Sequence, residues 1–169
     1  MSVGTDFHPF NRLVEWTDDW LLAHPEFTPR TLIQHGSSTP PTRACGATLV
    51  AYPQLQAAMS QASALVCHAG PATVFEARRH GLTPICVARD PDLGEHVDHH
   101  QQRFAQHMSA AGLVHWCENR ETYFEALDAE LVSRSVAAVG SSTSAVPSGV
   151  QPLAELVESL SIRTRRLKR

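Results

Sequence analysis

Residues 66–88, VCHAGPATVFEARRHGLTPICVA, contain the repeating unit from which the fold follows. A short apolar run ends at a Gly-Pro break, a helical segment follows, and a second break with Gly81 and Pro84 leads into another apolar run. Apolar runs of this length that alternate with helices are typical of a parallel sheet covered on both faces. The stretch therefore predicts a strand–helix–strand unit with its helix over residues 72–80.

The same alternation continues through the rest of the chain. The pattern predicts a strand fragment at 2–4, strands at 31–35, 47–52, 64–68, 84–88 and 113–116, and further helices at 11–24, 53–61, 95–110 and 121–132. Crossovers between parallel strands are right-handed as a rule. We therefore expect one doubly wound, Rossmann-like α/β domain over residues 1–138, a Ser/Gly/Pro-rich linker at 139–150, and a C-terminal helix with a basic tail at 151–169.

The composition argues against several functional classes. The 169 residues carry a formal net charge of −3, which provides no domain-wide basic field for nucleic acid. The four cysteines show no CxxC spacing, and Cys67 and Cys86 are expected in the core. The chain has neither a GxGxxG fingerprint nor the lysine of a P-loop. No apolar run approaches the length of a membrane-spanning helix, so we expect a soluble cytoplasmic protein.

Ligands of doubly wound folds bind beyond the carboxyl ends of the strands, where the loops 4–10, 35–43, 68–72 and 89–96 are expected. In HAGPAT (68–73), Gly70 permits close approach of a ligand, and Pro71 suits the first helical position. The amides of Ala72 and Thr73, the Thr73 hydroxyl and the helix dipole then form an anion site. An ordinary strand-to-helix turn explains this loop equally well.

Glu76 lies one turn into the same helix and has two interpretations. It can pair with Arg79 or His80 at i+3 or i+4, or it can accept two hydrogen bonds from a ribose diol, because a carboxylate is a bidentate acceptor. The residues alone favour the ion pair.

The segment GEHVDHHQQRFAQH (94–107) holds four histidines. His96 and His100 are spaced i,i+4 and could hold a metal on one helix face, but the segment is not HExxH and no third ligand is evident. The alternative, which we favour, is a polar helix start whose amide, imidazole and carboxylate groups meet sugar hydroxyls.

The opening GTDFHPF (4–10) also has two interpretations. It is either a turn in which Asp6 caps the next helix, or a site where Gly4 and Thr5 meet a phosphate and Asp6 or His8 acts as a base.

The stretch 66–105, with H-A-G-x-x-T-x-x-E-A followed by G-E-H-V-D-x-H-Q, resembles the donor-binding half of glycosyltransferase family 28. The opening VGTDFHPFNRLVEW resembles the start of its short, one-domain members, which include catalytic subunits of two-part N-acetylglucosaminyltransferases and of bacterial exopolysaccharide glycosyltransferases. The resemblance covers about residues 3–116. It implies one half of a GT-B enzyme, a UDP-sugar donor, inversion at the anomeric carbon, and no cofactor or essential metal.

By position, the resemblance assigns the diphosphate to residues 70–73, the ribose to Glu76, and the sugar to His100 and Gln101 with support from Asp98. The full set of expected donor-binding residues is Gly4, Thr5, His68, Gly70, Ala72, Thr73, Glu76, Glu95, His96, Asp98, His100 and Gln101, with His8 and Asp6 as catalytic candidates.

One Rossmann-like domain is half of a GT-B enzyme, so the resemblance implies a membrane-attached partner subunit that supplies the acceptor-binding half. That partner would recruit this chain to the inner face of the membrane and to a lipid-linked saccharide acceptor. The alternative is a non-catalytic nucleotide-sugar-binding or regulatory module, which the short first strand favours.

Overall fold

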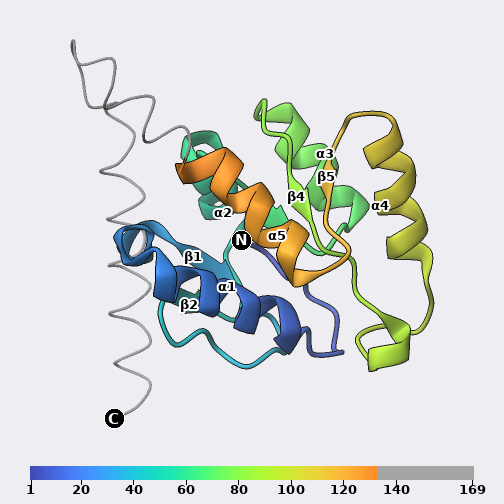
Figure 1. Ribbon diagram of the computed structural model, residues 1–169, viewed down its shortest axis with the longest axis horizontal. Coiled ribbons are helices and arrows are strands. Elements are labelled where there is room, and N and C mark those ends of the chain that lie inside the picture. Colours follow the sequence, from blue (N-terminus) through green and yellow to red (C-terminus); the bar gives the residue numbers. More distant parts are fainter. Residues whose placement is uncertain (133–169) are drawn as a thin grey trace. The chain divides into compact units, whose positions relative to one another are not determined.

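The computed structural model describes residues 1–132, which form two compact units, residues 1–61 and 62–132 (Figure 1). The linker predicted at 139–150 and the helix and basic tail predicted at 151–169 lie outside the described residues. Within residues 1–132, no helix has the length and apolar character needed to cross a membrane.

The first unit is built on a parallel strand pair, β1 (Leu32–Gln34) and β2 (Cys45–Ala47). Ser2 adds a single parallel bridge to Gln34, so the expected strand fragment at the start of the chain is present but minimal. Helix α1 (Asn11–Ala23) supplies the apolar stripe predicted from helical spacing, and its buried residues are Leu13, Val14, Thr17, Trp20 and Leu21. A 3₁₀ segment (Pro25–Arg30) leads into β1, and α2 (Tyr52–Gln61) ends the unit.

The second unit contains a three-stranded parallel sheet in the order β3 (Val66–Cys67), β4 (Ile85–Cys86) and β5 (His115–Trp116). Helix α3 (Pro71–Arg79) connects β3 to β4, and α4 (His100–Ala110) connects β4 to β5 (Figure 1). Both residues of β3 and of β4 are buried, as expected for strands covered on both faces. A core cluster joins these strands to Val74 of α3 and Ala105 of α4. Helix α5 (Arg120–Leu127) follows β5 and contacts β4. These parallel strands and intervening helices confirm the predicted Rossmann-like α/β fold.

Two predicted elements are misplaced. The strand expected at 47–52 is wrong, because pairing with β1 places β2 at Cys45–Ala47 and α2 begins at Tyr52. The prediction took the apolar residues at 47–52 for a buried strand, but Leu49 is 65 % exposed. The helix expected from residue 95 begins only at His100, after a 3₁₀ turn (Pro91–Leu93) and Gly94 in the left-handed region (φ 73°).

The helix predicted at 121–132 is divided. The α-helical part is α5, which ends at Leu127, and residues Asp128–Val132 continue as a π-helical turn. The start of α5 carries a capping box in which the Asn119 side chain accepts from the Thr122 backbone N–H at 2.9 Å. This cap explains why the helix begins where it does.

Candidate functional site

The turn between β3 and α3 has the geometry expected of an anion site. Pro71 occupies the first helical position, and the first intrahelical bond runs from the Val74 N–H to the Gly70 carbonyl at 3.0 Å. The amides of Ala72 and Thr73 therefore precede that bond, and Gly70 has no side chain with which to cap them. The first turn carries no acidic residue, Ala72 is exposed and Thr73 is half-buried. The positive end of the helix dipole is thus open to an anionic ligand.

Backbone strain and close packing shape this turn. Ala69 is fully buried and has φ 60°, a left-handed conformation that is uncommon for a residue with a Cβ. The His68 ring lies against Gly70, because a Cβ built on Gly70 would come within 2.3 Å of His68 Nε2. A Cβ at position 70 would therefore force the His68 side chain to move, while the Gly70 φ of −69° is ordinary.

Glu76 forms the ion pair with Arg79 that the sequence alone favoured. Its Oε2 lies 3.5 Å from Nη1 of Arg79 at i+3. The Glu76 side chain is 19 % exposed and that of Arg79 is 76 % exposed. An i,i+3 pair of this length with one exposed partner stabilises a helix by only a few tenths of a kcal/mol. This weak bond leaves the carboxylate able to take a stronger partner, and its ribose role stays a prediction.

A buried polar cluster follows β4 and includes Arg89, a residue that the sequence reasoning missed. Arg89 is fully buried and donates from Nη1 to the Glu95 carbonyl at 3.0 Å. The Arg89 backbone N–H donates to Gln101 Oε1 at 3.3 Å, and the Asp90 N–H donates to Glu95 Oε2 at 2.8 Å. Arg89 directly follows the apolar run 84–88, and that position at the end of a buried strand is the signal that could have identified it.

This cluster ties the loop that carries the histidines to the end of β4. Glu95 and Gln101 are each 5 % exposed, so in this structure they hold the loop in place from within. The sugar contact expected of Gln101 stays a prediction, as does the donor contact expected of Glu95.

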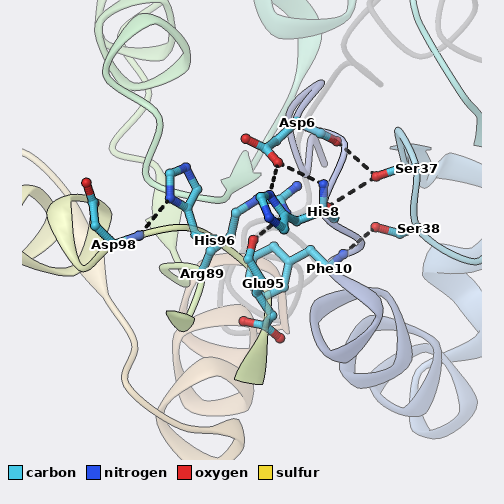
Figure 2. A network of polar contacts seen from close by, with 9 residues as sticks. All are labelled: Asp6, His8, Phe10, Ser37, Ser38, Arg89, Glu95, His96 and Asp98. Atoms are coloured by element: carbon cyan, nitrogen blue, oxygen red, sulfur yellow. Dashed lines mark hydrogen bonds and ion pairs between the residues drawn. The ribbon is translucent and has the colours of Figure 1, made fainter. Parts of the chain in front are cut away.

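His96, Asp98 and His100 lie together outside this buried cluster. Asp98 Oδ1 accepts from the His100 N–H at 2.8 Å and from His100 Nδ1 at 2.5 Å. The Asp98 N–H donates to His96 Nδ1 at 3.4 Å (Figure 2). The two bonds from His100, the backbone one foremost, lower the pKa of Asp98. An ionised carboxylate is an acceptor only, so His100 Nδ1 is the donor in this hydrogen bond.

Asp6 and His8 repeat this arrangement in the first unit. Asp6 Oδ1 accepts from the His8 N–H at 2.8 Å and from Nδ1 at 2.7 Å (Figure 2). Asp6 therefore does not cap α1, whose first helical residue is Asn11 and whose N-cap is Phe10, so the capping alternative is wrong. With Nδ1 donating to Asp6, Nε2 is the ring nitrogen that could accept a proton, as a general base must.

Serines that the sequence reasoning missed join the loops 4–10 and 35–43. Ser37 Oγ donates to the carbonyls of Asp6 at 2.9 Å and His8 at 3.2 Å, and the Phe10 N–H donates to Ser38 Oγ at 2.7 Å (Figure 2). A Cβ on Gly36 would lie 2.7 Å from the Gly4 carbonyl oxygen. Gly4 is buried with φ 86°, and Thr5 beside it is exposed. The two loops therefore meet, as the shared edge of a parallel sheet predicts.

The structure thus brings the candidates together in two sets. Gly4, Thr5, Asp6 and His8 share a loop of the first unit. In the second unit, His68, Gly70, Ala72, Thr73 and Glu76 belong to the β3–α3 turn and helix, and Glu95, His96, Asp98, His100 and Gln101 belong to the loop that enters α4.

A comparison with models of known families identifies the domain. The model of the glycosyltransferase family 28 C-terminal domain matches residues 3–152, which is most of the chain. Comparisons with curated proteins and with solved structures gave no match. The chain belongs to glycosyltransferase family 28 and is a Rossmann-like, nucleotide-sugar-binding glycosyltransferase domain.

Proposed function

We propose that this chain is the donor-binding, catalytic subunit of a hexosyltransferase that uses a UDP-sugar. The sugar, a hexose or N-acetylhexosamine, passes with inversion to a lipid-linked acceptor held by a membrane-attached partner subunit, as in exopolysaccharide biosynthesis. The observation that carries the proposal is the open start of α3, within the part of the chain that the family model matches. Amides there suit a diphosphate, and the nearby carboxylate of Glu76 suits a diol.

Catalysis in this proposal is mainly positioning and charge stabilisation. The amides of Ala72 and Thr73 offset the negative charge that grows on the leaving UDP as the glycosidic bond to phosphate breaks. A base must take the proton of the attacking hydroxyl. His8 suits this role because its Nδ1 lies 2.7 Å from Asp6 Oδ1, and this hydrogen bond orients the ring with Nε2 as the nitrogen that accepts the proton. No metal has a role in these steps.

The alternative is a nucleotide-sugar-binding module without catalytic activity. The single bridge that Ser2 forms with Gln34 favours it, since the strand leading into Gly4 and Thr5 is minimal. Sugar transfer to a lipid-linked acceptor by membranes that contain this chain and a partner subunit distinguishes the two. Transfer that persists in His8→Ala at the parental rate contradicts the role of His8 as base.

Calorimetric titration with UDP-N-acetylglucosamine and UDP-glucose tests the donor site. We expect Glu76→Ala to weaken binding by at least tenfold, because two hydrogen bonds to the ribose are lost. Arg79→Ala is the matched control, since it removes the ion pair but leaves the carboxylate, and it should bind like the parent. Equal affinity in Glu76→Ala and the parent, with both folded by circular dichroism, removes the nucleotide-site assignment.

A further inference from the structure

Three side chains with metal-binding atoms converge on the loop that enters α4. Within residues 1–132, His96, Asp98 and His100 offer one imidazole nitrogen or carboxylate oxygen each, and these atoms all lie within 4.8 Å of one another. The two imidazole rings meet edge to face with centroids 4.6 Å apart. The side chains of Asp98 and His100 are 55 % and 46 % exposed, so an ion can reach them from solvent.

We propose that His96, Asp98 and His100 form a binding site for a divalent transition-metal ion, with Zn²⁺ as its best match. Two imidazoles and a carboxylate are ligands that Zn²⁺ accepts, and imidazole in particular selects such ions over Mg²⁺ and Ca²⁺. The loop supplies the third ligand that helical i,i+4 spacing alone did not, because residues 95–99 lie outside α4 and bring Asp98 between the two histidines.

The existing hydrogen bonds prepare two of the ligands. His100 Nδ1 and Asp98 Oδ1 already face one another across a hydrogen bond, and the ion takes the place of the proton between them, because metal ligands bind in their deprotonated form. The His96 bond to the Asp98 N–H is long, at 3.4 Å, and is easily exchanged for a metal bond.

The geometry requires only small side-chain movements. Tetrahedral Zn²⁺ with bonds of about 2.0–2.1 Å separates its ligand atoms by about 3.4 Å. Atoms within 4.8 Å of one another reach that spacing by side-chain rotation of about an ångström. Three protein ligands leave the fourth position to water.

Metal binding has a consequence that rests on the proposed function. If Asp98 and His100 hold the donor sugar, a bound ion occupies both side chains and opposes donor binding. Zn²⁺ then acts at this site as an antagonist of the UDP-sugar and not as a cofactor of the transfer.

Calorimetry on the full chain without an affinity tag, after treatment with EDTA, tests the site. We expect ZnCl₂ to bind with a stoichiometry of about one, and His96→Ala and His100→Ala each to weaken binding about 10–100-fold, on the scale seen when metal-site residues are changed. His99→Gln is the matched control, because His99 lies between two ligands but bonds to Gln102 at 2.8 Å, and it should bind like the parent. Co²⁺ should give a visible absorption band in the parent and lose it in His100→Ala. Absence of binding, or equal affinity in the parent and both alanine variants, overturns the proposal.

A second titration separates this inference from the proposed function. UDP-N-acetylglucosamine is titrated into the chain with and without Zn²⁺, and a titration of the nucleotide sugar with ZnCl₂ in the absence of protein corrects for zinc held by the diphosphate. Weaker donor binding in zinc-loaded parent supports the antagonism, whereas unchanged binding overturns it and leaves the metal site standing. Absence of donor binding in the metal-free parent contradicts the proposed function alone.

Discussion

The imidazole of His68 lies so close to Gly70 that a Cβ at position 70 would approach His68 Nε2 to 2.3 Å. The two residues flank Ala69 in the turn that opens α3, so the shape of the proposed diphosphate site depends on their packing. Contact between them is steric, since Gly70 has an ordinary φ of −69° that any residue can adopt.

Gly70→Ala should therefore lower the free energy of unfolding by about 1–3 kcal/mol, as expected for overpacking. His68→Ala in the same chain should recover most of this loss, because the shortened side chain frees the space. A double-mutant cycle measured by urea unfolding gives the coupling. Additive effects of the two substitutions contradict the packing relationship.

Ala69→Gly should leave stability within about 0.5 kcal/mol of the parent, because opposing effects cancel. Glycine relieves about 1–2 kcal/mol of left-handed strain. It also loses a buried methyl group, at about 0.8 kcal/mol, and gains freedom in the unfolded chain, at about 0.4–1 kcal/mol. Ala77→Gly is the control, since Ala77 is equally buried but lies within α3. It should destabilise the protein by about 2 kcal/mol. Equal losses in both variants by chemical denaturation rule out strain at Ala69.

Gln101→Leu should destabilise the protein by about 1–3 kcal/mol, because the buried Arg89 N–H loses the acceptor that Gln101 Oε1 provides. Gln102→Leu should change stability by less than about 0.5 kcal/mol, since Gln102 bonds only at the surface, to His99. Thermal unfolding of the two neighbouring variants measures the difference. Comparable melting temperatures for both variants would show that the buried hydrogen bond from Arg89 to Gln101 contributes little to stability.

Thiol reactivity should distinguish Cys45 from the other cysteines. Cys67, Cys86 and Cys117 are buried, and Cys45 is half-buried. Burial, helped by the Glu125 carboxylate, raises the pKa of Cys117 to about 12, and the hydrogen bond with Cys67 together with burial raises the pKa of Cys86. The thiols of Cys86 and Cys117 stay protonated at pH 8 and react slowly, because the thiolate is the nucleophile. The hydrogen bond with Cys86 lowers the pKa of Cys67, but full burial keeps the reagent from its sulfur. We expect one fast reaction with Ellman's reagent in native protein and four after unfolding. A fast native reaction in Cys45→Ser contradicts this.

The sequence predicted the order of strands and helices and the loops that carry the chemistry, because these depend on local patterns. Apolar runs identified β3 and β4, and the Gly-Pro break identified the start of α3 within one residue. The prediction was wrong at residues 47–52, where the position of the strand depends on its pairing partner. A strand forms where a neighbouring strand offers hydrogen bonds, and not merely where apolar residues occur.

Only the tertiary structure decided how the individual side chains are used. The amide of Gln101 is a group that suits a sugar hydroxyl. In the fold its Oε1 accepts from the Arg89 backbone N–H, because a buried N–H must find an acceptor. His96 and His100 lacked a third ligand in sequence, and the loop that precedes α4 places Asp98 between them. Local propensity sets the elements, whereas side-chain partners depend on contacts across the fold that no short stretch of sequence specifies.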